Sequence, residues 1–451
     1  MIADDLLGAV CEHFSDAAQQ TRYKKRGDKS VRVMGGYNVM LLGDLFQLAP
    51  IPSSAAIFGP PTDKKTEQAK VALNLFWGVD ADALNRFFEL DEQQRLAKSE
   101  HWYGQVLNEC RNGALSAESF NFLMGLPTEH SGCHMPDGTT LCSAPACRDL
   151  PLLWRDMRLR CTEWTDLSAE ETCSQCRNER ERRNRLVEAG DPRVLEEPFL
   201  SAPYIHRNNV PKYHAMLLRA EEHAKRTHNF RIWFAAQDTP CNPAEIGKNP
   251  EQVKAKLARF LQFHDQQTEG IPGLCLLYPG LQMRVTAKIM KNSKVTILKH
   301  TPCTVVGWEL HSHDKVIVDE KGERFLTYQP KTIFVKFENC DWQIGSLPPG
   351  VFPMFPVTKT WDLNKQSGVK VRRKGYTLVP DFACTAFMMQ GTSLPAALAD
   401  CGDVLTQGSM SDMMTAYVIL SRVKKVGGLL LLRVFLRISS SMASRQGRAA
   451  L

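Results

Sequence analysis

The sequence lacks any apolar run long enough to cross a membrane. The longest strongly apolar stretch near the carboxyl end runs from Gly428 to Leu436 and contains Arg433, whereas a transmembrane helix needs about 20 consecutive apolar residues. The amino-terminal stretch carries Asp4, Asp5 and Glu12 where a secretory signal peptide carries positive charge. We therefore expect neither a membrane-spanning nor a secreted protein.

The cysteine content and the net charge are also modest. The 14 cysteines among 451 residues fall far below the density of a small disulfide-stapled scaffold, so we expect reduced thiols, with a metal site as an alternative. Hydrophobic residues make up 43% and charged residues 23%, which excludes a mostly disordered chain. The net charge of +7 suits a nucleic-acid partner without requiring one.

A phosphate-binding loop is missing as well. The P-loop pattern G-x-x-x-x-G-K-[ST] places backbone amides and a lysine on nucleotide phosphates. Lysine precedes serine or threonine at five positions, and none of these lysines follows a glycine: Lys29, Lys65, Lys98, Lys331 and Lys359.

The first residues indicate a helix followed by a buried strand. Ile2, Leu6, Val10 and Phe14 recur at every fourth position, which predicts one apolar helix face. The apolar run 37–42, ended by Gly43 and Asp44, has the length of a buried strand. A buried strand that ends in an acidic residue is a common way to build a ligand site in an α/β domain.

Further elements follow along the chain. Helical spacing is present around 102–110, and a capping box at 168–171 predicts a helix that continues to 186. Strands are expected at 204–205 and 231–235, with helices at 211–226 and 252–264. From 276 to 337 the apolar period changes to two, which predicts a small antiparallel β unit. The tail after 437 is expected to be disordered.

Four ordered segments carry the strongest functional signal. Residues 35–52 read GGYNVMLLGDLFQLAPIP and residues 88–115 read FELDEQQRLAKSEHWYGQVLNECRNGAL. Residues 378–394 read LVPDFACTAFMMQGTSL, and residues 416–433 read AYVILSRVKKVGGLLLLR. Together they resemble the later motifs of the Pif-type DNA helicases, superfamily 1 motors related to RecD. The resemblance covers about half of the chain, at both ends.

The resemblance implies roles for particular residues. Arg95 and Arg422 would be catalytic arginines that reach the γ-phosphate of ATP, and permanently charged, fork-shaped guanidinium groups suit that task. Asp44 and Gln47 match the segment that senses the nucleotide, and Gly391 would also lie in the nucleotide site. The alternatives are a surface arginine at 95 or 422 and a turn-capping aspartate at 44.

Nucleic-acid contacts are implied for a second set of residues. Thr385 and Gln390 fit the motif that touches the single strand, and Lys288 and Lys291 of the β unit could contact phosphates. Solvated lysines on a β surface are an equally good interpretation. The family usually carries His-Lys-Ser just before the Gln-Gly pair, whereas this chain has apolar residues at 387–389. Apolar side chains at these positions cannot make the polar, cationic and hydroxyl contacts of the family's residues.

The resemblance also implies a fold and domain boundaries. We expect an α/β protein with RecA-like motor domains, the first one incomplete. Residues 1–127 would belong to the first domain, 128–200 to a Cys/Arg-rich helical insert, 201–284 with 376–436 to the second domain, 285–375 to a small barrel-like β insert, and 437–451 to the tail. The chain would begin downstream of both nucleotide-binding motifs, Walker A and Walker B.

The cysteine-rich insert raises a separate hypothesis. Cys142 with Cys147 and Cys173 with Cys176 form two pairs whose spacings zinc sites use. Cys133, His134 and Cys161 offer alternative ligands, and small core cysteines are the other interpretation.

The expected function follows from the resemblance. Family members unwind duplex DNA by ATP- and Mg²⁺-dependent translocation along single strands, in repair, recombination and telomere maintenance. The partner would be single-stranded DNA or a forked duplex, in the nucleus or another DNA-containing compartment. Without a P-loop we expect no ATP hydrolysis by this chain alone. Two alternatives remain: a catalytically inactive single-strand-binding protein, and a zinc-stapled interaction module.

Overall fold

The computed structural model describes a defined part of the chain, divided into two compact units. Unit 1 comprises Met1–Arg207 and Thr385–Leu451, and unit 2 comprises Asn208–Cys384. The boundaries expected from the sequence stay predictions. The described residues are 3–18, 21–44, 47–48, 50, 56–57, 66–79, 83–90, 94–116, 119, 123, 192–247, 249–291, 295–320, 322–363, 368–402 and 410–433.

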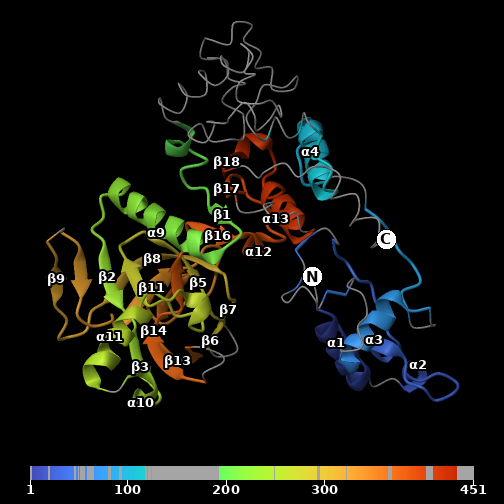
Figure 1. Ribbon diagram of the computed structural model, residues 1–451, viewed down its shortest axis with the longest axis horizontal. Coiled ribbons are helices and arrows are strands. Elements are labelled where there is room, and N and C mark those ends of the chain that lie inside the picture. Colours follow the sequence, from blue (N-terminus) through green and yellow to red (C-terminus); the bar gives the residue numbers. More distant parts are fainter. Residues whose placement is uncertain are drawn as a thin grey trace, which may run out of the picture. The chain divides into compact units, whose positions relative to one another are not determined.

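The amino-terminal part of unit 1 is a pair of packed helices, α1 (Asp4–Ala17) and α3 (Glu67–Trp77), with the short segments α2 (Thr21–Lys24) and η1 (Val33–Gly36) beside them (Figure 1). The predicted first helix is confirmed, but its buried face is different. Leu7 and Cys11 are buried, whereas Leu6 and Phe14 are more than half exposed. A fourth-residue repeat rotates by about 40° per step around a helix, so it drifts away from a fixed partner.

Glycine at position 8 lets these two helices come close. A Cβ built on Gly8 would lie 1.9 Å from the carbonyl oxygen of Gln68, near the start of α3. Helix α3 itself begins with a capping interaction, because the Thr66 hydroxyl accepts a hydrogen bond from the Ala69 amide at 3.1 Å.

The strand predicted at 37–42 is wrong. Residues Tyr37–Leu42 form no strand, and Met40 and Leu42 are 80% and 82% exposed. A buried strand is stabilised by pairing with neighbouring strands and by cover on its faces. Within the described residues, nothing pairs with this segment.

The rest of unit 1 is a small parallel sheet with helices. Strands β1 (Tyr204–His206), β17 (Ala397–Asp400) and β18 (Leu429–Arg433) run parallel, which confirms the predicted strand at 204–205. At the other edge of this sheet, β16 (Ala383–Thr385) carries the chain from one unit to the other. The chain is therefore a mixed α/β protein, as expected.

Helix α4 (His101–Arg111) packs against α13 (Met410–Leu420), and α12 (Ala386–Met389) also contacts α13. The Tyr103 hydroxyl donates to the Leu420 carbonyl at 2.9 Å. Single-turn helices η3 (Lys98–Glu100), η5 (Pro192–Leu195) and η7 (Val426–Gly428) complete the described helices of this unit.

Unit 2 is dominated by antiparallel sheets, as the period-two pattern predicts. The largest has the strand order β12-β11-β8-β5-β15. Its members, in chain order, are β5 (Gln282–Val285), β8 (Pro302–Glu309), β11 (Thr332–Lys336), β12 (Val351–Met354) and β15 (Leu378–Pro380).

A second sheet has the order β4-β2-β10-β9, and a third the order β13-β14-β3. Their strands are β2 (Ile232–Ala235), β3 (Gln237–Pro240), β4 (Leu274–Leu277), β9 (Val316–Val318), β10 (Arg324–Leu326), β13 (Val357–Asp362) and β14 (Lys370–Gly375). Strands β6 (Ile289–Lys291) and β7 (Val295–Ile297) form a hairpin.

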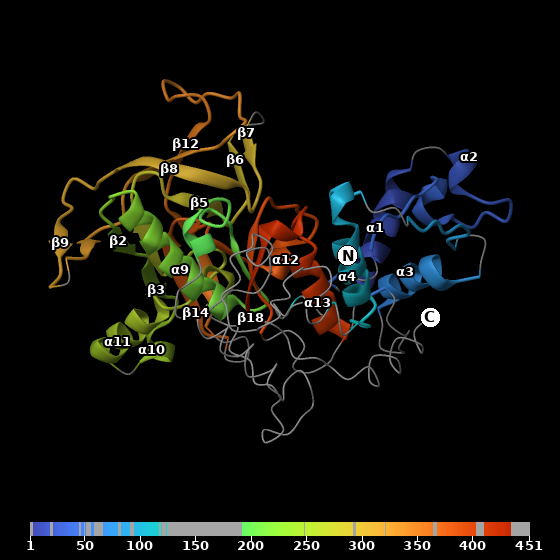
Figure 2. The same cartoon turned by 90° about the horizontal axis from the view of Figure 1, so that it is seen from above.

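The helices of unit 2 are α9 (Asn209–Arg226), α10 (Pro243–Ile246), α11 (Pro250–Phe260) and the single turn η6 (Asp265–Gln267) (Figure 2). The helices predicted at 211–226 and 252–264 are thus confirmed, with the second one shorter at its end. Among all described residues, no helix is both long and apolar enough to span a membrane.

Candidate functional site

The segment that follows the mispredicted strand forms a compact turn around Asp44. The Gln47 amide donates to the Asp44 carbonyl at 3.2 Å, and the side-chain Nε2 of Gln47 donates to Asp44 Oδ2 at 3.4 Å. The turn therefore fixes the orientation of the Gln47 side chain and leaves its Oε1 oxygen to accept a hydrogen bond from elsewhere.

Arg111 ties this turn to helix α4. Its Nη2 donates to Asp44 Oδ1 at 3.3 Å, and both side chains are about three quarters buried. A carboxylate that accepts bonds on both oxygens is oriented rigidly. Arg111 is a site residue that the sequence reasoning did not single out.

Gln390 joins the turn from the carboxyl-terminal part of the chain. Its Nε2 donates to Gln47 Oε1 at 3.1 Å. Just before it, the Thr385 hydroxyl caps α12 by accepting from the Met388 amide at 3.4 Å. Gly391 follows with a φ of +81°, and a Cβ placed there would meet open space. The structure thus joins Asp44, Gln47 and Gln390 by hydrogen bonds, while the separate roles that the resemblance implies for them stay predictions.

Arg422 lies beside the same turn, but its guanidinium is held by the chain itself. It is fully buried. Nε donates to the Val418 carbonyl at 2.6 Å, Nη1 to the carbonyls of Met389 and Thr392 at 3.0 and 3.1 Å, and Nη2 to the Ser421 hydroxyl at 2.6 Å. Four of its five N–H groups are therefore engaged, and in this conformation Arg422 clamps the 389–392 turn to the end of α13.

Arg95 is less buried and approaches the same end of α13. Its Nη1 donates to the Ser421 carbonyl at 3.1 Å. Nearby, the Ala97 amide donates to the Lys424 carbonyl at 3.2 Å, and Glu100 accepts from the Val426 amide at 3.1 Å. These bonds place the 95–100 segment along 421–426, so that both predicted catalytic arginines lie in one region of unit 1.

The charges in this region influence one another. Burial, together with the Arg95 guanidinium, lowers the pKa of Arg422 to about 10. Burial and the Asp44 carboxylate raise the pKa of Tyr417, while the guanidinium groups of Arg111, Arg95 and Arg422 counteract this rise. Tyr417 on α13 is a second member of the cluster that the sequence reasoning did not single out, although it lies in the 416–433 segment.

The remaining predicted residues are not part of this cluster. Lys288 is exposed just before β6, and Lys291 ends that strand; both belong to unit 2. The proposed zinc ligands Cys142, Cys147, Cys173 and Cys176 lie outside the described residues, as do the predicted helix at 168–186 and the tail after 437.

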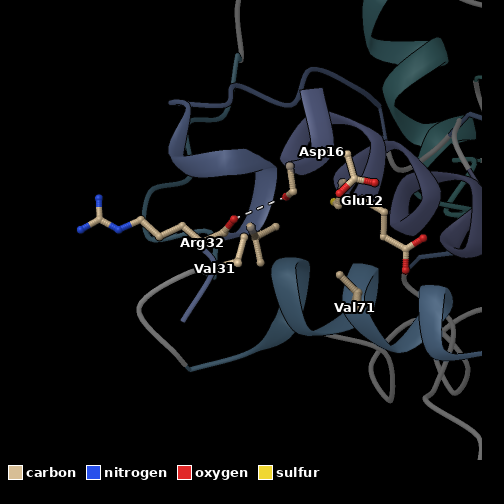
Figure 3. A pocket seen from close by; sticks show the side chains of 8 residues that line it. Glu12, Asp16, Val31, Arg32 and Val71 are labelled. Atoms are coloured by element: carbon tan, nitrogen blue, oxygen red, sulfur yellow. Dashed lines mark hydrogen bonds between the residues drawn. The ribbon is translucent and has the colours of Figure 1, made fainter. Parts of the chain in front are cut away.

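A hollow of about 390 Å³ lies in another part of unit 1 (Figure 3). It is lined by α1 residues, among them Glu12 and Asp16, by the 31–33 segment and by Val71 of α3. The Arg32 side chain points away from it, while the Arg32 carbonyl accepts from the Ser15 hydroxyl at 3.5 Å. None of the predicted site residues that the structure describes lines this hollow.

The described residues of this cluster do not form a complete ATP and Mg²⁺ site. The sequence contains no P-loop pattern, and Arg422 is bonded to its own chain. Among the described residues, no group of three or more His, Cys, Asp or Glu side chains could hold a metal ion. The arrangement orients the side-chain amides of Gln47 and Gln390 and the carboxylate of Asp44 by hydrogen bonds.

No protein-family model matches the sequence, and no curated protein matches it. Solved structures of Pif1 helicases are similar to it. The Pif1 helicase from Candida albicans is 14% identical with a TM-score of 0.45, over 100% of this chain and 75% of that chain. The Pif1 helicase from Bacteroides in complex with ADP-AlF3 and single-stranded DNA is 12% identical with a TM-score of 0.46, over 100% and 73%.

A structure of two coordinating Pif1 helicases at forked duplex DNA is 14% identical with a TM-score of 0.46, over 100% of this chain and 72% of that chain.

Proposed function

We propose that this chain is a Pif-type helicase module that binds single-stranded or forked DNA in genome maintenance. The observation that carries the proposal is the hydrogen-bonded path from Arg111 through Asp44 and Gln47 to Gln390. These four residues come from three of the four segments that resemble the family. Segments that are far apart in sequence but meet through specific side-chain bonds form one site rather than scattered surface features.

In this proposal, the path transmits the position of the 44–47 turn to the segment that touches the single strand. Thr385 and Gln390 would contact DNA, with Lys288 and Lys291 adding phosphate contacts. The physical basis is the rigidity of the path, because each side chain between Arg111 and Gln390 is bonded on both sides. A shift at one end therefore changes the hydrogen bonding at the other.

ATP hydrolysis by this chain alone is not part of the proposal. Catalysis of phosphoryl transfer depends on groups that stabilise charge developing on the transferred phosphate, and the P-loop pattern is missing from the sequence. Arg95, whose Nη1 donates to the Ser421 carbonyl at 3.1 Å, stays a predicted nucleotide contact. The second candidate, a single-strand-binding protein without turnover, is favoured by the bonding of Arg422 to its own chain.

Fluorescence anisotropy with a labelled thymidine oligonucleotide tests the binding. We expect saturable binding at low salt whose affinity falls linearly on a log–log plot against salt concentration. Gln390→Ala should weaken it several-fold. Gln343→Ala is the matched control, because Gln343 is exposed and, among the described residues, its side chain bonds the nearby Leu347 carbonyl at 2.9 Å.

Two outcomes would contradict the proposal. Absence of binding at low salt would exclude a DNA-binding module, and equal affinities of the Gln390 and Gln343 variants would exclude the site. DNA-stimulated ATP hydrolysis, measured in parallel, separates the two candidates: turnover that Arg95→Ala abolishes would establish a motor, and its absence would leave the binding protein.

A further inference from the structure

Strand β9 forms an unusually apolar free edge of unit 2. It is the last strand in the order β4-β2-β10-β9 and lies at the outer margin of that unit in both views (Figures 1 and 2). Its residues Val316, Ile317 and Val318 are 47%, 56% and 58% exposed. Within the described residues, only β10 pairs with it. An exposed hydrophobic edge strand is a template for another strand.

The hydrogen bonds to β10 determine which backbone groups face the free edge. The Asp319 amide donates to the Glu323 carbonyl at 2.9 Å, and the Thr327 amide donates to the Lys315 carbonyl at 3.3 Å. Hydrogen-bonded pairs alternate along an antiparallel ladder, so Lys315, Ile317 and Asp319 direct their backbone groups toward β10. The N–H and C=O groups of Val316 and Val318 therefore point outward.

The edge is self-complementary. We propose that β9 pairs antiparallel with β9 of a second copy of this chain, about a two-fold axis at Ile317. In that register, Val316 of one copy faces Val318 of the other, and the outward groups of both make four backbone hydrogen bonds. Lys315 then faces Asp319 of the second copy on each side of the axis, which gives two opposite-charge pairs.

Other registers of the two β9 strands lack this match of apolar and charged side chains. A parallel pairing in register would put Lys315 opposite Lys315, and like charges directly opposite each other are destabilising. An antiparallel shift by two residues would put Lys315 opposite either Ile317 or position 321, another lysine in the sequence. Within Lys315–Asp319, only the register centred on Ile317, among these, pairs every apolar side chain with an apolar one and both charges with their opposites.

The face of the sheet beside the axis supports the same arrangement. Phe325 on β10 is paired with Ile317 and is 38% exposed. Pairing of two β9 strands would place Ile317 and Phe325 of both copies in one continuous apolar row. The edge is only three residues long, so we expect weak, concentration-dependent dimers of the kind that small interfaces support.

Disulfide trapping of the full chain tests the register directly. Cysteine at 317 would face itself across the axis at a separation that a disulfide can span. Cysteine at 316 would face position 318 and lie farther from its own copy. Under mild oxidation we expect Ile317→Cys to form at least about five times more covalent dimer than Val316→Cys, above the wild-type background from native cysteines.

Sedimentation velocity provides an independent readout. Lys315→Glu places like charges opposite each other and should abolish dimers. Lys374→Glu makes the same charge change at an exposed position of β14 and should leave them unchanged. A wild-type protein that stays monomeric at every concentration, or cysteine variants that cross-link equally, would overturn the proposal. Circular dichroism on each variant verifies that the fold is retained.

Discussion

The side-chain amide of Gln390 donates to Oε1 of Gln47 at 3.1 Å and so joins two residues 343 positions apart in the sequence. Gln47 at the same time donates to Asp44, so its amide is bonded at both ends. An amide that is bonded on both sides connects two segments of the chain, which an exposed side chain without such bonds does not do. The coupling free energy between Gln47 and Gln390 can be measured without any ligand.

We expect a double-mutant cycle on Gln47→Ala and Gln390→Ala to show coupling of about 0.5 to 1.5 kcal/mol, the typical net contribution of one hydrogen bond between neutral groups. The measurement is the free energy of unfolding from urea titrations of the wild type, both single variants and the double variant. Additive losses, with coupling near zero, would show that the bond contributes nothing in solution.

Arg422 is expected to act as a structural clamp. Its guanidinium is fully buried and bonds three carbonyls and one hydroxyl. Arg422→Met keeps much of the volume but leaves these acceptors without partners, which should lower the free energy of unfolding by about 3 kcal/mol. The control is Lys424→Met, two residues away and exposed, with an expected change within about 0.5 kcal/mol.

The free energies of unfolding of both variants are measured without nucleotide or DNA, so that only contacts within the chain contribute to them. An arginine whose only role is to contact phosphate would leave the stability of the free protein unchanged when it is replaced. Equal stabilities of the Arg422 and Lys424 variants would therefore contradict the clamp and return Arg422 to the role that the resemblance implies.

Local patterns in the sequence predicted much of unit 2 and, in unit 1, helices α1 and α4. The period-two runs indicated strands such as β8 and β11, because alternation is a property of a single strand. The buried face of α1 could not be predicted in the same way. Which side of the helix is buried depends on α3, more than 50 residues later in the sequence, and on the close approach at Gly8.

For the candidate site too, sequence motifs indicated some residues, and only the tertiary structure revealed the others. Motif resemblance singled out Asp44, Gln47 and Gln390 in separate roles, and the structure joins them by hydrogen bonds. Arg111 and Tyr417 were missed because an arginine in the last turn of a helix and a tyrosine in an apolar helix are common in any fold. Only the tertiary arrangement reveals that both lie near Asp44.

The ion pair between Arg373 and Asp238 is the strongest stability determinant that we expect in unit 2. Arg373 donates from Nε and Nη2 to the two carboxylate oxygens at 2.8 and 2.7 Å, and the two side chains are 0% and 2% exposed. The same guanidinium also donates to the carbonyls of Phe260 and Ile271 at 2.6 and 3.3 Å. The pair thus connects β14, β3, the end of α11 and the 271 segment.

Arg373→Ala should therefore lower the free energy of unfolding by about 3 to 5 kcal/mol, because it leaves a buried carboxylate without its partner. Arg372→Ala removes the same side chain from the neighbouring position of the same strand, where it is exposed, and should change stability by no more than about 0.5 kcal/mol. Urea denaturation of both variants, followed by tryptophan fluorescence, compares them under the same conditions.

The double variant Arg373→Met with Asp238→Leu separates the charge effect from general loss of packing. Replacing both members of a buried pair by apolar groups is far less costly than removing one, although the carbonyls of Phe260 and Ile271 still lose their donor. We therefore expect the double variant to be more stable than Arg373→Ala. If it is less stable, or if Arg372→Ala is as destabilising as Arg373→Ala, the buried pair is not what holds these elements together.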